Sequence, residues 1–362
     1  MKHIVKPLLT LSLSIFLFGC ATKKPVPVQA SVTTVTKQPI TASQNQATLE
    51  TPIVTSQPIK TPTPRPVPTQ NQPTQATPQT TQSQHQTSQY GESTFHQKFK
   101  LPKKIKESSG LIKVDGRLWT FNDSGGKAEL YQISEKNGRI LKTLKITNAR
   151  NVDWEDIAFD DSYVYIGDIG NNRGNRKNLK IYKIPRASLR TQKKVRAEVI
   201  AYRYSDQKNF SSRPHKNNYD CEAMVAHNGK LYLFSKNWQN QKTRLYELSS
   251  QAGKHKAKYL STFNTDGMVT GASLNEEMGI LLLTSYSRLL SVEVWAFTNY
   301  QNSHFFKGDK KRLNFKNPLQ GQIEGVTFNG NYQAYLSSEA FSKYIFSFDA
   351  SLYEVDFRRE FE

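Results

Sequence analysis

One sequence unit recurs five times in the C-terminal part of the chain, at intervals of roughly 50 residues. Each copy has a short apolar strand that begins at an acid or a hydroxyl, then a turn and two further strands. The first strands begin at Ser109, Glu155, Glu222, Thr270 and Glu324. Because strand units repeated radially at such a period form the blades of a propeller, the repeat predicts an all-β propeller fold.

The later strands of the unit also align between the copies. The second strands read "LWTFND", "VYIGDI", "LYLFSK", "LLLTSY" and "AYLSSE". The third strands ("LYQI", "IYKI", "LYEL", "VWAF" and "IFSF") place one aromatic in register, at Tyr131, Tyr182, Tyr246, Trp295 and Phe346. A weaker fourth strand follows in four copies, so we predict a β-propeller of five four-stranded blades. A sixth blade stays open because the interval from Glu155 to Glu222 is long, and a β-sandwich is the competing architecture.

Two segments compete for the outer strand of the fifth blade. "TFHQKFKL" precedes the first blade, and "SLYEVDF" follows the last one. If the N-terminal segment pairs with the fifth blade, the ring closes without an exposed strand edge.

The first twenty residues have the pattern of an export signal. Basic residues precede the apolar run "LLTLSLSIFLF", which is too short to span a bilayer as a helix. The run ends in "LFGC", which resembles the lipobox of bacterial lipoproteins. We therefore predict that residues 1–20 are a lipoprotein signal peptide and that Cys20 is lipidated (a palmitate-type anchor); the alternative is an ordinary signal peptide with a chance cysteine. Ala21 in place of an Asp favours an envelope protein of the outer membrane over the inner membrane.

Residues 21–95 differ from the rest of the chain in composition. Thr, Gln and Pro make up more than half of these positions, and such a segment cannot bury enough apolar surface to fold. We predict a disordered linker at 21–95 and a propeller domain at 96–362. The formal net charge of the chain is +20, which suits anionic partners, although solubility alone would also explain it. We expect a monomer without specific nucleic-acid binding, and a domain with one cysteine, Cys221, has no internal disulfide.

Acidic side chains gather at the starts of the first strands. Because the innermost strands of a propeller line its channel, residues at these starts and two positions earlier should meet at one mouth. Carboxylates that converge there repel one another, and Ca²⁺, which accepts six to eight oxygen ligands, would relieve the repulsion. The predicted calcium ligands are Glu107, Asp153, Glu155, Asp220, Glu222 and Glu324. The alternative is structural, with these carboxylates accepting backbone N–H bonds or pairing with nearby cations.

The second strands end at the same mouth because they run antiparallel to the first strands. Their ends, together with the turn "GNNRGNRKN", supply carboxylates, amides and cations to a ligand. The predicted ligand-binding residues are Asp123, Asp168, Asn171, Asn172, Arg173, Arg176, Lys236 and Glu339.

Six short motifs resemble those of one group of bacterial proteins. The motifs "ESSGL", "FNDSGG", "DWEDIA", "GDIGNN", "CEAM" and "IEGVTF" are similar to the phytase-like and SdiA-regulated propellers. This resemblance implies a six-bladed, secreted or envelope-associated propeller that often binds calcium, in a group where many members lack an assigned activity. The predicted count of five blades departs from it.

Two functions from different classes follow from these patterns. The first is a lipid-anchored binding protein whose propeller holds an anionic ligand or an envelope partner at an acidic, calcium-binding face. The second is a calcium-dependent hydrolase of phosphate esters or lactones, in which Lys236, Arg173 and Arg176 would hold the anion. The sequence has no HExxH, GxSxG or phosphate-loop motif, so it indicates no catalytic residue.

Overall fold

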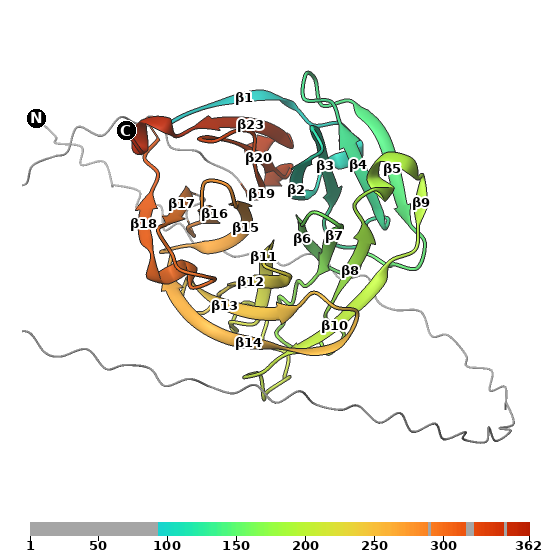
Figure 1. Cartoon of the computed structure of the whole chain (residues 1–362), viewed down its shortest axis with the longest axis vertical. Coiled ribbons are helices and arrows are strands. Elements are labelled where there is room, and N and C mark those ends of the chain that lie inside the picture. Colours follow the sequence, from blue (N-terminus) through green and yellow to red (C-terminus); the bar gives the residue numbers. More distant parts are fainter. Residues whose placement is uncertain (1–92, 289–290, 316–321, 344–345) are drawn as a thin grey trace, which may run out of the picture. The chain divides into compact units, whose positions relative to one another are not determined.

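The computed structural model describes residues 93–288, 291–315, 322–343 and 346–362. These residues form a ring of five four-stranded blades around a central channel (Figure 1). The predicted signal peptide, Cys20 and nearly all of the predicted linker lie outside the described residues. The predicted domain boundary at residue 96 falls inside the first strand, which begins at Thr94.

The blades follow the chain order, and their strands run from the channel outward. The first blade contains β2 (Ser108–Val114), β3 (Arg117–Asn122), β4 (Glu129–Ile133) and β5 (Ile140–Ile146). The second contains β6 (Trp154–Phe159), β7 (Tyr163–Asp168), β8 (Lys180–Pro185) and β10 (Glu198–Tyr204). The third contains β11 (Asp220–His227), β12 (Lys230–Lys236), β13 (Lys242–Ser249) and β14 (Gly253–Asn264). The fourth contains β15 (Met268–Asn275), β16 (Ile280–Tyr286), β17 (Val292–Thr298) and β18 (Asp309–Arg312).

The fifth blade joins the two ends of the described chain. It contains β19 (Ile323–Phe328), β20 (Gln333–Ser338), β23 (Ser351–Asp356) and β1 (Thr94–Lys100), with β1 antiparallel to β23. The N-terminal segment therefore closes the ring, as one of the two sequence alternatives predicted. The other segment, "SLYEVDF", is the third strand of the blade and not its outer strand.

The predicted third strand of the fifth blade was wrong. Phe346 belongs to β22 (Phe346–Phe348), which pairs only with β21 (Phe341–Lys343) in a separate hairpin. The residue equivalent to the other third-strand aromatics is Tyr353 in β23, which packs between the fourth and fifth blades. The hairpin misled the alignment because it has the same aromatic alternation as a blade strand.

The remaining elements are short connections. They are η1 (Lys103–Ile105), α1 (Ser188–Thr191), β9 (Lys194–Val195), η2 (Phe305–Lys307) and η3 (Arg358–Glu360). The long interval between the second and third blades contains α1, β9 and an irregular segment, so it adds no sixth blade. No helix among the described residues is long and apolar enough to cross a membrane.

Apolar residues fill each space between neighbouring blades. Leu231 and Leu233 of β12 pack toward the second blade, whereas Tyr232 and Phe234 pack toward the fourth. This alternation has the two-residue period of a strand whose two faces are both buried. The third-strand aromatics predicted in the first four blades all lie in these spaces, each against the preceding blade. Cys221 is free and buried in one of them.

Two of the turns between first and second strands are Asx–Gly pairs with the backbone conformation of a β-hairpin turn. Asp115 and Gly116 have φ of 50° and 65°, and Asn228 and Gly229 have φ of 49° and 69°. Two successive positive φ values match the twist of the flanking strands, and Asn, Asp and Gly adopt them most readily. These turns set the register between the first and second strands of their blades, and hence which side chains reach the channel.

Candidate functional site

Every inner strand has a β-bulge near its start, at the same aligned position. The bulges lie at Ser109 with Gly110, and at Glu155, Glu222, Thr270 and Glu324. A bulge leaves one residue outside the ladder and redirects its side chain. The aligned residues that the sequence singled out are therefore the ones whose side chains the backbone redirects at one end of the channel.

The two hydroxyl residues in this aligned set tie inner strands together. Ser109 Oγ donates to the Glu155 carbonyl at 2.5 Å, and Thr270 Oγ1 donates to the Ile323 carbonyl at 2.6 Å. The three glutamates instead carry their carboxylates to the channel end. We call this end the acidic mouth and define it by Asp123, Asp153, Glu155, Glu222, Lys236, Glu324 and Glu339.

Three carboxylates of the acidic mouth meet closely at the junction of the first and second blades. Asp123 follows β3, Asp153 precedes β6 and Glu155 lies in β6; one ligand oxygen from each lies within 4.8 Å of the others. We call these residues the carboxylate triad. All three were predicted from the sequence, Asp153 and Glu155 as calcium ligands and Asp123 as a ligand-binding residue.

Burial and mutual repulsion shift the pKa of each triad residue upward. Desolvation raises the pKa of Asp123 to about 6, and desolvation followed by the charge of Asp123 raises that of Asp153 to about 8. Glu155 is only 4% exposed, and the same two causes raise its pKa well above the usual value. Three deprotonated carboxylates at this spacing are unfavourable without a cation.

Gly170 of the "GDIGNN" motif packs directly against the triad. A Cβ at this position would collide with the carboxylates of Glu155 and Asp153, the latter at 2.6 Å. Only glycine therefore lets the backbone after β7 approach the triad so closely. The motif is visible in the sequence, but the role of its second glycine depends on the position of the triad and could not be predicted.

Several of the predicted ligand-binding residues hold this backbone in place. Arg176 donates to Asp168 Oδ1 at 2.6 Å and to the Gly170 carbonyl at 2.5 Å, and lies 3.8 Å from Asp153 Oδ2. Asn171 donates its side-chain amide to the Tyr219 carbonyl and accepts the Arg176 backbone N–H. The structure thus uses Asp168, Asn171 and Arg176 for internal contacts.

Asn172 and Arg173 lie on the outer side of the same turn. The Asn172 carbonyl accepts the side chain of Asn217 at 3.0 Å. The Arg173 side chain is exposed and takes part in none of the hydrogen bonds or ion pairs among the described residues. Arg173 also lowers the pKa of His215, after the larger effect of burial, so its charge reaches the surroundings of the mouth.

Lys236 neutralises the part of the mouth that lies beside the third blade. Its ammonium lies 2.5 Å from Glu222 Oε2, and both side chains are 5% exposed. The same ammonium lies over the rings of Trp238 and Tyr286, at 4.9 and 5.0 Å from their centroids. Desolvation lowers the pKa of Lys236, but the charge of Glu222 and other nearby groups outweighs it, so the ammonium is retained. Burial also raises the pKa of Glu222, and the pair is enclosed.

The other predicted acids occupy different surroundings. Asp220 accepts the Asn171 backbone N–H at 2.5 Å and Trp238 Nε1 at 2.6 Å, so both its oxygens have partners. Glu107 forms an exposed ion pair with Lys106 at 3.2 Å. Glu324 and Glu339 have no hydrogen bond or ion pair through their carboxylates within the described ranges, and burial raises the pKa of both.

One buried acid escaped the sequence analysis. Asp156 is fully buried and accepts the backbone N–H groups of Ile157 and Met224, at 2.8 and 2.7 Å, so it joins two inner strands. The aligned residues of the other blades are Gly110, Ala223, Gly271 and Gly325. The sequence signal for a special role at this position is an aspartate where the other four blades have glycine or alanine.

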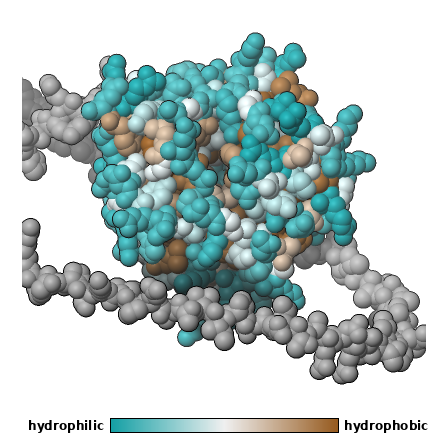
Figure 2. Space-filling model, viewed as in Figure 1, coloured by the Kyte–Doolittle hydropathy of each residue, from teal (hydrophilic) through white to brown (hydrophobic). Residues whose placement is uncertain are grey.

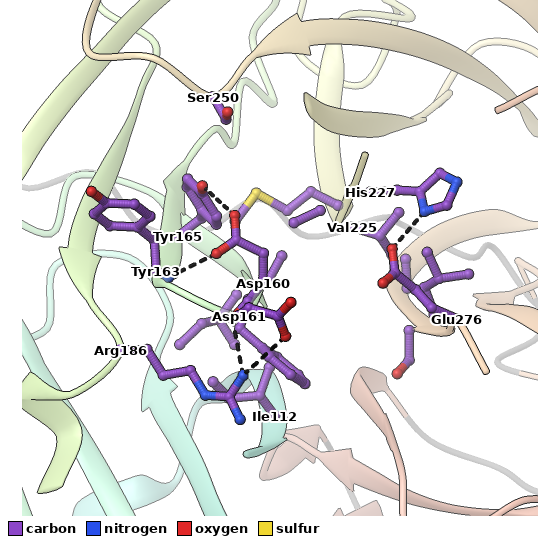
Figure 3. Close-up of a pocket in the computed structure, with 18 of the residues that line it drawn as sticks. Ile112, Asp160, Asp161, Tyr163, Tyr165, Arg186, Val225, His227, Ser250 and Glu276 are labelled. Atoms are coloured by element: carbon purple, nitrogen blue, oxygen red, sulfur yellow. Dashed lines mark hydrogen bonds and ion pairs between the residues drawn. The ribbon is translucent and has the colours of Figure 1, made fainter. Parts of the chain in front are cut away.

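A separate cavity of about 840 Å³ opens at the other end of the inner strands (Figure 3). Its floor is apolar, and its rim carries charged groups that are bonded to one another. His227 Nδ1 lies 2.6 Å from Glu276 Oε1, and the Tyr165 hydroxyl donates to Asp160 Oδ2 at 2.7 Å. None of the predicted site residues lines this cavity.

Comparisons with known proteins identify no family and give only distant similarities to solved structures. No protein-family model matches the chain, and no curated protein matches it. Among solved structures, a chain of the nidogen/laminin complex is similar at 15% identity and a TM-score of 0.40, covering 72% of this chain and 97% of that one. The RRP9 WD40 repeats are similar at 9% identity and a TM-score of 0.36, covering 72% and 97%. A protein of unknown function from Bacteroides thetaiotaomicron VPI-5482 is similar at 10% identity and a TM-score of 0.40, covering 68% and 58%.

Proposed function

We propose that this protein is a lipid-anchored envelope protein whose propeller binds Ca²⁺ at the carboxylate triad and an anionic ligand or partner beside it. The observation that carries the proposal is the state of Glu155. This residue is only 4% exposed, its carboxylate lies close to two others, and the carboxylate takes part in no hydrogen bond or ion pair in the part of the chain that the structure describes. A buried carboxylate without a partner is unfavourable, and a cation at the triad would remove that penalty.

The donor set favours a hard cation. The three triad side chains offer carboxylate oxygens, and the group of potential ligands contains neither imidazole nor thiolate. Oxygen ligands suit Ca²⁺ or Mg²⁺, whereas zinc and copper sites usually contain His or Cys. Ca²⁺ is the better candidate because it accepts irregular geometries with large coordination numbers, and three side chains on two blades are not an octahedral cage.

Lys236 limits how many ions the mouth would hold. Its ammonium already lies against Glu222, and the Lys236 charge also acts on Glu324. We therefore propose one calcium ion at the junction of the first two blades. On the side of the mouth beside the third blade, the ammonium of Lys236 would neutralise the acids instead. This proposal is narrower than the sequence-based hypothesis, in which the predicted calcium ligands come from four blades.

The charge beside the triad suggests what the ion would bind. Three protein carboxylates leave coordination positions for the oxygens of a ligand. Arg173 is exposed on the turn that carries Gly170 and has no internal partner among the described residues, so its guanidinium is available to an anion. A carboxylate or phosphate group of a ligand or partner would fit both the ion and Arg173.

The envelope location rests on the N-terminal sequence pattern. The export signal, the Cys20 lipobox and the Thr/Pro/Gln-rich linker together support a propeller tethered to a membrane, with the outer membrane favoured. The resemblance to the phytase-like and SdiA-regulated propellers supports the same location. The five blades differ from the six of that group, so we do not transfer its active site.

Hydrolysis of phosphate esters or lactones is the second candidate function. The observation in its favour is the raised pKa values of Asp123 and Asp153, because a general acid or base works best with a pKa near the operating pH. Turnover of a panel of phosphate esters and lactones that requires Ca²⁺ and is lost in Asp153→Asn would establish this alternative over simple binding.

Calorimetric titration of the metal-free full-length chain with Ca²⁺ tests the proposal. We expect one site, with affinity lowered at least tenfold in Glu155→Gln because one charged ligand is lost. Glu276→Gln removes a carboxylate at the opposite end of the channel and is the matched control, so its affinity should not change. No heat of binding by the wild type, or equal losses in the two variants, would reject the calcium site.

A further inference from the structure

At two places on the perimeter, the outer strand of a blade pairs with a strand from outside that blade. β5 of the first blade pairs with β9 in parallel, and β10 of the second blade pairs with β14 of the third, also in parallel. In both ladders the register places two cations directly opposite each other: Lys145 opposite Lys194, and Arg203 opposite Lys256. Like charges at directly opposite positions destabilise a sheet, so these pairs call for an explanation.

Protection of a strand edge explains only one of these cations. Lysine often blocks the open edge of a sheet against pairing with another chain. Lys194 lies on β9, the last strand of its sheet, so it could protect that edge. In contrast, β9 covers β5 at Lys145, and β10 and β14 both lie inside their sheet, so no open edge is present at Lys145, Arg203 or Lys256.

Internal ion pairs do not explain them either. Some surface cations sit beside acids, as Lys98 does with Glu354 at 3.0 Å and Lys230 with Glu247 at 2.6 Å, whereas others, such as Lys136 and Lys307, have no ion pair among the described residues. The exposed cations of β5, β9, β10 and β14 also take part in no ion pair among the residues that the structure describes, and they differ from the scattered ones in lying on strands that follow one another. We call this set the basic arc: Lys145, Lys194, Arg203, Lys254, Lys256 and Lys258. The one acid on these strands, Glu198, lies near Lys183 instead.

The strands present the basic arc outward. Ile200, Tyr204 and Ala257 are buried in the core between the second and third blades. Arg203, Lys254 and Lys256 alternate with these buried residues and are exposed, so they face away from that core. In Figure 1 the four strands follow one another along the right and lower perimeter of the ring.

We propose that the basic arc is a docking surface for an anionic phospholipid bilayer. The like-charge pairs are unfavourable in the free protein and become favourable beside a surface of phosphate headgroups. The basic arc and an anionic bilayer have opposite charge and are both extended, so a row of cations along the strands can contact many headgroups at once. Each Lys or Arg near an anionic bilayer adds attraction that fades within about 10 Å at 0.1 M salt.

An extended surface fits the arc better than a single soluble anion. A phosphate ion is normally bound by several donors that converge on one point. The cations of the arc are instead spread along extended strands. Figure 2 shows that the face of the ring seen in Figure 1 is mainly hydrophilic. On the arc strands themselves, the exposed large hydrophobic side chains among the described residues are Leu141 and Tyr259, which the six cations outnumber, so a charged partner is favoured over an apolar one. The arc lies on other strands than the carboxylate triad, so the docking surface and the calcium site can be tested separately.

Vesicle co-sedimentation of the full-length Cys20→Ser chain, which lacks the lipidated residue, tests the docking surface. We expect binding to vesicles of phosphatidylglycerol and phosphatidylcholine, no binding to phosphatidylcholine alone, and weakening with salt. Arg203→Gln with Lys256→Gln should weaken binding about 30-fold, about fivefold for each charge removed. The same double variant should melt at a higher temperature without vesicles, because it removes a like-charge pair.

Lys136→Gln with Lys307→Gln is the matched control, since both lysines are exposed and lie outside the arc. We expect this pair to keep vesicle binding, and all variants to keep calcium binding. Equal losses in the two pairs would show an effect of net charge only and overturn the proposal. Equal binding to both kinds of vesicle would also overturn it, as would displacement by inorganic phosphate at constant ionic strength.

Discussion

Single residues at the acidic mouth divide it into two electrostatic halves. Beside the third blade, Lys236 makes an enclosed pair with Glu222. Beside the first two blades, the cation at the carboxylate triad is Arg176, which lies 3.8 Å from Asp153 Oδ2 but makes its shorter ion pair, at 2.6 Å, with Asp168. The sequence indicated both the acids and Lys236. It could not indicate the division, because the division depends on which side chains the bulges bring within contact.

The pH dependence of stability follows from the raised pKa values in the triad. The folded-state pKa values of Asp123 and Asp153 are about 6 and about 8, above the unfolded value of about 3.9. The folded chain therefore holds more protons in this window, and metal-free stability should fall as the pH rises from about 4 to about 8. Melting temperatures in EGTA and in Ca²⁺ should diverge with pH, with the larger calcium effect at pH 8 than at pH 5. A calcium effect that is equal at both pH values would contradict the assignment.

Gly170→Ala tests the close approach of backbone and triad. The added Cβ collides with the Glu155 and Asp153 carboxylates, so we expect a loss of about 1–3 kcal/mol in unfolding free energy. We also expect calcium affinity to fall at least tenfold, because the supporting contacts of the ligands shift. Gly279→Ala is the control: its φ of 63° is unfavourable for alanine, but no atom lies within 4 Å of the new Cβ. It should lose about 1–2 kcal/mol of stability by urea denaturation and keep calcium affinity.

At the scale of elements, the repeat predicted most of the fold and missed one strand. The first strands, their turns and four of the five third-strand aromatics lie where the alignment placed them. The fifth was misplaced because "IFSF" and "LYEV" share the alternation of a blade strand. Local pattern cannot separate them, since only pairing with β20 and β1 makes β23 the third strand. The five bulges were equally invisible in sequence, because a bulge is a property of the pairing between two strands.

Removal of β1 should destabilise the closed ring strongly. The strand covers the edge of β23, and its Phe95 packs against Phe315 and Tyr353, while Lys98 pairs with Glu354. A chain that begins at Gly91 should unfold at the same temperature as the chain without its signal peptide. A chain that begins at Leu101 should lose several kcal/mol and aggregate through the open edge. Thermal unfolding and light scattering check this; equal melting temperatures of the two truncated chains would show that β1 does not close the ring.

At the scale of the whole molecule, the two proposed modes of membrane attachment have different strengths. A lipid at Cys20 would hold the chain hydrophobically, whereas the basic arc would act electrostatically and only near the surface. A tether also raises the effective concentration of a weak docking surface, so each mode would strengthen the other. Sequence alone predicted the lipid and the net positive charge. It did not predict the arc, because the arc depends on which outer strands pair between blades.

Membrane fractionation of cells that produce each variant separates the two modes. Wild-type protein should stay in the membrane fraction in both low and high salt and should incorporate labelled fatty acid. Cys20→Ser should incorporate none, and it should remain partly membrane-bound in low salt but be released by high salt, because ionic screening weakens the contact of the arc. Adding Arg203→Gln and Lys256→Gln should release the Cys20→Ser chain in low salt as well, whereas adding Lys136→Gln and Lys307→Gln should not. Fatty-acid labelling of the Cys20→Ser chain would contradict the predicted anchor. If that chain is fully released in low salt before any change in the arc, the bilayer contact is absent.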